Sequence, residues 1–352
     1  FRSAAVLAGS CFPDPASPFQ FARRLRLLAA RKSPIFAGHQ DSASLPAETY
    51  SLIGTYLNPC VLHDVTLFTR YGLYRLVTDR ISLSVLLPTY SGDNPETLNK
   101  AIDSVVEQTR PPDEIVIVRD GPLTPELITV LERWDDDDRV PITQVDLSEN
   151  VGLGGALREG MKHVQGDYVA RMDSDDISVS NRFEKQTRYL RENPEVDILG
   201  GYITEFSETP ENVLAERTVP TEHDEIARMA RFRSPFNHAT VVMRTEMVLS
   251  AGNYRAVDRM EDWDLWSRML LDGARTANLS EVLLYVRAGE EMYSRRGGME
   301  YASAEWARQR EFLSRGFVTS LQFVRNLATR IPVRLLPDRV RGWVYKRLFR
   351  KT

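Results

Sequence analysis

Residues 81–90, ISLSVLLPTY, and residues 113–122, DEIVIVRDGP, are the two stretches that decide the fold. Each contains a compact, largely apolar run, Leu83–Leu87 and Glu114–Val118, with the length of a buried strand. Between them, Pro95–Gln108 has apolar residues at helical spacing. This order of strand, helix and strand predicts two parallel strands joined by a helix.

The same alternation continues along the chain. Ile142–Val145 and Asp167–Met172 have the pattern of further strands, and Pro125–Trp134 and Gly152–Val164 that of further helices. Short connections between such elements predict a mostly parallel sheet with helices on both faces. We therefore expect an α/β domain over residues 81–300 with a Rossmann-like, nucleotide-binding half.

The flanking segments differ in composition. Residues 1–80 show no clean alternation, so we expect an N-terminal extension of unknown role that is disordered in part. Residues 301–352 should form a helical, basic, amphipathic C-terminal tail. In it Phe317, Leu321, Val324, Ala328 and Ile331 share a helical face, and the last twenty residues are strongly basic. Such a tail suits an anionic membrane surface; the alternative is packing on its own domain.

Composition limits the classes of function. The 352 residues carry a formal net charge of −4, which gives no support to a nucleic-acid partner. The two cysteines, Cys11 and Cys60, form no C-x-x-C pair. No run of about 18 apolar residues occurs, as a transmembrane helix would require. We expect a cytoplasmic protein, peripheral on the inner face of the plasma membrane through its tail.

A polar or glycine-rich turn comes after each of the four expected strands. Ligands of a parallel sheet bind beyond the carboxyl ends of its strands, so these turns should meet at one edge. They are Pro88-Thr89-Tyr90, Asp120-Gly121-Pro122, Glu149–Gly154 and Asp173–Asp176. An Asp-Gly turn and a glycine-rich helix start are common, so the second and third turns alone are weak signals.

The last of these turns, Asp173-Ser174-Asp175-Asp176, places three carboxylates in four residues. Their repulsion is costly unless a cation or solvent offsets it. Mg²⁺ and Mn²⁺ bind carboxylate oxygens together with substrate phosphates. Capping of a helix that starts at Ile177 is the alternative, but the position after a strand favours a metal.

A second acidic cluster, Glu261-Asp262-Trp263-Asp264, lies far along the chain. Acids are stabilised in the first turn of a helix, so capping is one interpretation. A general base that deprotonates an acceptor hydroxyl is the other. Trp263 and Trp266 would form a platform for a sugar or belong to the core, and we expect at least one of them in the core.

Five motifs in this order resemble family 2 inverting glycosyltransferases with the GT-A fold, and most of all the bacterial exopolysaccharide and amylovoran-type subgroup. They are Leu86–Tyr90, Val118–Pro122, Asn150–Gly154, Asp173–Asp176 and Glu261-Asp262. The resemblance implies a nucleotide-sugar donor, a divalent Mn²⁺ or Mg²⁺, and transfer of a sugar with inversion.

The resemblance also implies a role for each matching position. Asp262 would be the catalytic base with Glu261 beside it, and Asp175 would hold the metal together with Asp173. The implied donor contacts are Thr89, Tyr90, Asp120, Asn150, Gly152, Arg158, Asp173 and Ser174. The candidate acceptor or phosphate contacts are His238, Trp263, Arg295 and Arg296. For His238 a structural role, and for the two arginines a solvated loop, stay open.

Two departures refine the expectation. Arg119 stands where many relatives have the first of two acids, and the Q-x-x-R-W motif of processive synthases is absent. We expect transfer of one sugar per encounter, from a UDP-sugar to a lipid-linked or polysaccharide precursor of a cell-surface glycan.

Two other classes stay open. One is a nucleotidyltransferase that makes sugar nucleotides, although the loop after the first strand lacks the lysine that this class needs. The other is a non-catalytic carbohydrate-binding relative, against which the intact Asp175 and Asp262 argue.

Overall fold

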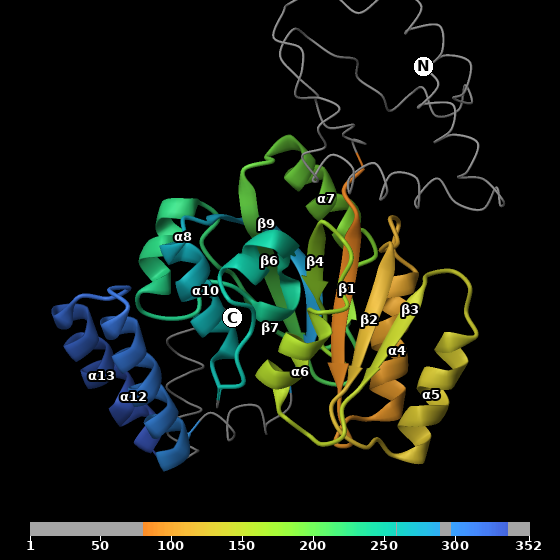
Figure 1. The fold of residues 1–352 in the computed structure, drawn as a ribbon, viewed down its shortest axis with the longest axis horizontal. Coiled ribbons are helices and arrows are strands. Elements are labelled where there is room, and N and C mark those ends of the chain that lie inside the picture. The colour runs from red at the N-terminus through yellow and green to blue at the C-terminus, as the bar shows by residue number, and fades with distance from the viewer. Residues whose placement is uncertain (1–79, 258, 289–296, 337–352) are drawn as a thin grey trace, which may run out of the picture. The chain divides into compact units, whose positions relative to one another are not determined.

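The computed structural model describes residues 80–257, 259–288 and 297–336. The expected N-terminal extension, Arg295 and Arg296, and the basic segment after Leu336 lie outside these ranges. The described part is an α/β fold around one nine-stranded sheet, with strand order β3-β2-β1-β4-β8-β6-β9-β5 and β7 paired to β6 (Figure 1).

The four strands predicted from the sequence form one half of this sheet and are all parallel. They are β1 (Leu83–Thr89), β2 (Glu114–Arg119), β3 (Ile142–Asp146) and β4 (Tyr168–Arg171). β1 continues through Pro88 to Thr89, beyond the predicted end at Leu87. The proline is tolerated because β4 pairs with β1 only as far as Leu86, so no partner on that side needs its amide.

Helices cover both faces of this half, as predicted. They are α4 (Pro95–Val106), α5 (Pro125–Asp135) and α6 (Leu153–Gly160). Leu83, Val85 and Leu87 of β1 share one core cluster with α4 and α5, whereas Leu86 shares the other with α6. This alternation along β1 is due to the two-residue repeat of a strand.

The other half of the sheet is mixed, so the expectation of a mostly parallel sheet holds only for the first half. Its strands are β5 (Ile177–Ser178), β6 (Val196–Phe206), β7 (Val213–Arg217), β8 (Val242–Arg244) and β9 (Arg275–Arg287). β8 runs antiparallel to both β4 and β6, and β9 runs parallel to β6. The helices here are α7 (Arg182–Glu192), α8 (His223–Ala230), α9 (Thr245–Ser250) and α10 (Glu261–Leu271).

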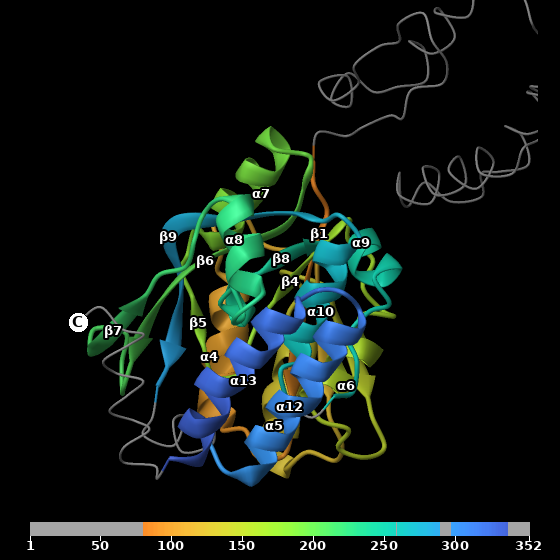
Figure 2. The same ribbon diagram turned by 90° about the vertical axis from the view of Figure 1, so that its left-hand side faces the viewer.

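Two further helices, α12 (Met299–Ser314) and α13 (Ser320–Leu335), lie side by side next to α8 and α10 (Figure 2). Trp263 of α10 packs against Phe312 of α12, with ring centroids 4.9 Å apart. The Asp264 carboxylate, fully buried on α10, forms ion pairs with Arg308 at 2.7 Å and Arg315 at 2.9 Å. No helix of the described residues is long and apolar enough to cross a membrane.

Candidate active site

The loop after β1 turns back onto the strand end through Asp93. The Asp93 carboxylate accepts hydrogen bonds from Thr89 Oγ1 at 2.8 Å and from the Tyr90 amide at 3.2 Å. Ser174, from the turn after β4, bonds the same carboxylate. Tyr90 is 42% exposed, which leaves its ring accessible to a ligand at the sheet edge.

The turns after β2 and β3 are tied to each other. The buried Asp120 carboxylate accepts a hydrogen bond from the Val151 amide at 2.7 Å, and the Asp120 carbonyl accepts one from Asn150 Nδ2 at 3.3 Å. Gly121 has a φ of +83°, and a Cβ there would lie 2.7 Å from the Asn150 nitrogen. Only glycine fits this approach, so the Asp-Gly pair fixes the position of the glycine-rich turn. In that turn Gly152, at φ +76°, caps the start of α6.

The turn after β4 divides its acids between the surface and the interior. Asp176 is 2% exposed and accepts a hydrogen bond from the Arg287 amide at 3.1 Å. Asp173 and Asp175 are solvent-accessible, and Asp173 pairs with the buried Arg171. Strand β5 begins directly after Asp176, and α7 begins only at Arg182. The alternative interpretation of these aspartates as caps of a helix from Ile177 is therefore wrong.

Like charges crowd this turn. Desolvation, followed by the charges of Asp173 and Asp93, raises the pKa of Asp175 to about 6. Desolvation raises the pKa of Asp93 as well, with a smaller contribution from Asp173. A bound cation would lower the free-energy cost of ionising these neighbouring carboxyl groups.

The carboxylates fit a divalent cation that is shared with a substrate. Among the residues described, no cluster of three or more His, Cys, Asp or Glu side chains forms a complete metal site. Mg²⁺ and Mn²⁺ at nucleotide sites use only one or two protein carboxylates and complete their shells with phosphate oxygens and water. Asp173 and Asp175 supply such a donor set.

The second acidic cluster begins α10, after a strained stretch of backbone. Arg259 and Met260 have φ of 62° and 59°, in the left-handed region. Non-glycine residues persist there only where the surrounding structure holds them, and such strain is frequent at active sites. Ser234 Oγ donates to Asp262 Oδ2 at 2.9 Å. Asp262 Oδ1 accepts no hydrogen bond from the described part of the chain.

Glu261 has a neutral histidine beside it. His238 Nδ1 lies 4.0 Å from Glu261 Oε1, and His238 Nε2 lies 3.0 Å from the Tyr254 hydroxyl. Burial, with the charge of Arg171, lowers the pKa of His238 well below its usual value, so this contact is not an ion pair. Desolvation, followed by the charge of Asp262, raises the pKa of Glu261 to about 7.

The two groups of carboxylates lie close enough to affect each other. A Cβ on Gly154 of α6 would lie 2.2 Å from the Arg255 carbonyl oxygen and 3.1 Å from Glu261 Cβ. The glycine-rich turn is thus packed against the segment that leads into α10. Besides desolvation, the charges of Arg171 and Asp173 also shift the pKa of Glu261. The structure therefore brings the strand-end turns and the start of α10 to one site.

Two predicted residues differ in their burial. Trp263 is 1% exposed, and its Nε1 donates to the Ala230 carbonyl at 2.6 Å. It belongs to the core, as does Trp266, so the expected acceptor contact of Trp263 is corrected. Arg158 lies on the surface of α6, where its Nε donates to Glu159 Oε1 at 3.1 Å.

Four residues of the site were not singled out from the sequence: Asp93, Arg171, Ser234 and Tyr254. A signal existed for Arg171, because a charge at the end of an apolar strand requires a buried partner. Ser234 and Tyr254 gave no local signal, since their partners are 28 and 16 residues away.

Known proteins share this sequence pattern. The sequence model of the family described as Glycosyl transferase family 2 matches residues 84–253. An uncharacterized glycosyltransferase of Haemophilus influenzae is 40% identical over 271 residues, 77% of this chain and 100% of that protein. The UDP-Gal:alpha-D-GlcNAc-diphosphoundecaprenol beta-1,3-galactosyltransferase of Escherichia coli is 36% identical over 78% of this chain and 98% of its own length. The amylovoran biosynthesis glycosyltransferase of Erwinia amylovora is 38% identical over 75% and 98%.

Solved structures share the fold. TarS 1-349 of S. aureus in complex with UDP-GlcNAc has a TM-score of 0.54 at 19% identity, over 72% of each chain. The mannosyltransferase PcManGT of Pyrobaculum calidifontis, in complex with GDP-Man and Mn²⁺, has a TM-score of 0.53 at 16% identity, over 76% of each chain. This chain belongs to glycosyltransferase family 2. It has the GT-A fold and is a glycosyltransferase.

Proposed function

We propose that this enzyme transfers a single sugar from a UDP-sugar to a hydroxyl of a lipid-linked precursor of a cell-surface glycan, with inversion at the anomeric carbon. The observation that carries the proposal is that Glu261, next to Asp262, lies close enough to Asp173 for the charge of Asp173 to affect its pKa, while Ser234 holds Asp262. The relative that acts on a diphosphoundecaprenol acceptor supports the choice of acceptor and donor.

In the proposed mechanism, different residues act on the acceptor side and on the donor side of the transferred sugar. An inverting transfer needs a base on the acceptor side, opposite the leaving diphosphate. Asp262 takes the proton of the acceptor hydroxyl through Oδ1, because Ser234 engages Oδ2. Glu261, with a pKa of about 7, holds the acceptor through a hydrogen bond in either protonation state.

On the donor side, Tyr90 and Asp120 hold the base, and the glycine-rich turn at Asn150 and Gly152 approaches the ribose. Asp173 and Asp175 would hold a divalent cation, and that cation would offset the negative charge of the leaving diphosphate. The buried Arg171 orients the Asp173 carboxylate through their ion pair.

A transfer assay tests the proposal. The full-length protein is incubated with Mn²⁺, a panel of UDP- and GDP-sugars, and α-D-GlcNAc diphosphate esterified to a methyl group. We expect one UDP-sugar to react and the product to show the opposite anomeric configuration by NMR. Retained configuration, or hydrolysis of the donor without transfer, would contradict it.

We further propose that the protein is peripheral on the inner face of the plasma membrane. Its last residues, 337–352, contain six Lys or Arg against one Asp, and basic segments of this kind are attracted to anionic lipid. Truncation inside α13 would remove Arg334, a partner of the buried Glu305, so substitutions are the better test. Replacing the six cations by Gln should abolish sedimentation with anionic liposomes, and unchanged sedimentation would refute membrane binding by this segment.

A further inference from the structure

The last two helices bury polar side chains and expose apolar ones. The residues that α13 buries most are Asn326, which hydrogen-bonds Gln309 at 2.9 Å, and Arg334, which pairs with Glu305 at 3.2 Å. The outward side chains are Met299, 75% exposed, Trp306, 51%, Leu321, 80%, Val324, 60%, and Leu335, 50%. Large exposed apolar side chains on two paired helices are typical of a binding surface.

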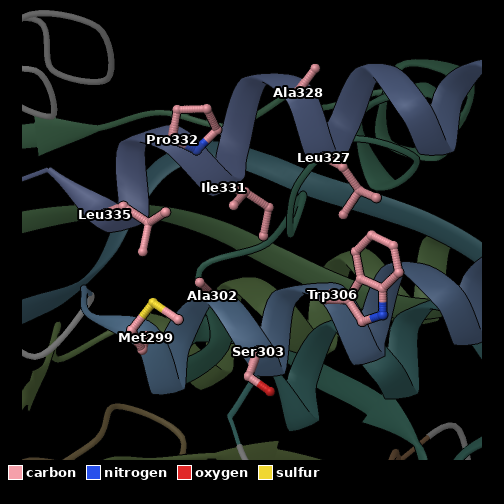
Figure 3. Close-up of a pocket in the computed structure, with 9 residues that line it drawn as sticks. All are labelled: Met299, Ala302, Ser303, Trp306, Leu327, Ala328, Ile331, Pro332 and Leu335. Carbon is pink, nitrogen blue, oxygen red and sulfur yellow. The ribbon is translucent and has the colours of Figure 1, made fainter.

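A groove of about 520 Å³ runs between α12 and α13. Leu327 and Ile331 of α13 point toward Ala302 and Trp306 of α12 (Figure 3). The remaining lining residues are Met299, Ser303, Ala328, Pro332 and Leu335. Ser303 is the one polar side chain among these nine, so the groove offers almost nothing to a sugar or a nucleotide. It suits a hydrocarbon chain, whose burial is favourable in proportion to its apolar area.

One end of the groove adjoins the catalytic segment. Next to Met299, Glu300 pairs with Arg259 at 3.3 Å, and the Arg259 guanidinium lies 5.1 Å from the Tyr301 ring centroid. Arg259 precedes Glu261 by two residues. The Glu300 side chain is 85% exposed, and an exposed ion pair contributes little. A guanidinium has five N–H donors, so a diphosphate at this end can bind Arg259 while the guanidinium keeps its present partners.

We propose that this groove binds the isoprenoid chain of a lipid-linked acceptor, with the diphosphate at Arg259 and the sugar at the start of α10. The inference rests on the proposed function, because it takes the acceptor to be a sugar diphosphate on a lipid. Because a helix lines each side of the groove, its shape fits a single hydrocarbon chain better than the flat surface of a bilayer. The cation at this end of the groove, Arg259, comes three residues before Asp262, and this matches the order of chain, diphosphate and sugar in such a molecule.

Two acceptors and two matched variants test the inference. The acceptors are α-D-GlcNAc diphosphate esterified to farnesol and to methanol, used without membranes. The groove variant is Met299→Gln with Leu335→Gln, which adds polar amides without a charge near the diphosphate. The control is Leu321→Gln with Val324→Gln, which makes the same change at exposed apolar positions that do not line the groove. All four residues are at least half exposed, so folding should survive in both.

The wild type should use the farnesyl acceptor with a KM about tenfold lower than the methyl acceptor, equivalent to about 1.4 kcal/mol. In the groove variant, the KM for the farnesyl acceptor should rise to that for the methyl acceptor, and the reaction with the methyl acceptor should be unchanged. The control should keep the wild-type difference in KM. Farnesyl monophosphate, titrated calorimetrically, should bind the wild type and the control but not the groove variant.

Three outcomes would overturn the inference. If the wild type uses both acceptors equally, the groove has no role although the proposed function stands. If the control loses the preference as fully as the groove variant, a general apolar surface acts instead. If neither acceptor reacts with any donor, the proposed function fails and this inference fails with it.

Discussion

At the scale of single residues, the site depends on carboxyl groups that are costly to ionise. Glu261 is the sharpest case, because desolvation and the neighbouring Asp262 raise its pKa from 4.5 to about 7. A carboxyl with a raised folded-state pKa stabilises the fold while it is protonated. That stability is complete below the unfolded-state pKa and is lost as the pH rises through the folded-state pKa. Glu261 thus destabilises the enzyme at neutral and alkaline pH.

We predict that Glu261→Gln removes this pH dependence. Between about pH 4.5 and pH 7 the wild type should lose up to about 3 kcal/mol of unfolding free energy that the variant keeps, so at pH 8 the variant should be the more stable protein. Urea unfolding across this range measures the effect. Glu126→Gln, at an exposed first turn of α5, serves as the control. A variant as pH-dependent as the wild type would show that Glu261 ionises normally.

At the scale of elements, helix α6 packs closely against the segment that leads into α10. Gly154 lets α6 approach the chain before α10 so closely that an added Cβ would meet the Arg255 carbonyl oxygen at 2.2 Å. Backbone atoms cannot move aside as a flexible side chain can. Any residue larger than glycine must therefore push the segment that carries Glu261 and Asp262.

We predict that Gly154→Ala lowers turnover at least about tenfold and destabilises the fold by about 1–3 kcal/mol, the usual cost of overpacking. Ala156→Gly, the opposite change in the same helix, should cost about 1 kcal/mol of stability while leaving turnover near wild type. Kinetics at saturating donor, together with thermal unfolding, compare the two. Equal turnover in both variants would show that this close packing has no role in turnover.

The elements that could be predicted from the sequence are those with a local pattern of their own. β1 to β4 and α4 to α6 have clear periodicity, and the acidic turns stand out by composition. β5 has only two residues, and Gly200 and Gly201 interrupt the pattern of β6, so these strands are defined by their partners rather than by their sequence. Within the site, Ser234 and Tyr254 are positioned in the same way, by contacts that no local pattern records.

At the scale of the whole described unit, buried ion pairs hold α12 against α10. Asp264 is fully buried and pairs with Arg268 of its own helix and with Arg308 and Arg315. The sequence showed the apolar stripe of α13 but not that it faces outward, because the buried polar face acquires its partners only through tertiary contacts.

We predict that Asp264→Asn destabilises the protein by about 3–5 kcal/mol, because it leaves buried arginines without their carboxylate. Glu96→Gln, which breaks the exposed pair of Glu96 with Lys100, should cause no measurable change. Thermal unfolding of the two variants gives the comparison. A shift no larger for Asp264→Asn than for Glu96→Gln would show that the helices are held by apolar packing alone.

The proposed mechanism gives the carboxylates at the two ends of the site different roles. The most direct measurement determines turnover and UDP affinity, with and without Mn²⁺, for Asp262→Asn and Asp175→Ala. Asp262→Asn should bind UDP as the wild type does and lose about 100- to 10,000-fold in turnover, the usual contribution of a general base. Asp175→Ala should lose the Mn²⁺-dependent part of UDP binding. Wild-type turnover in Asp262→Asn, or unchanged Mn²⁺-dependent binding in Asp175→Ala, would contradict the account.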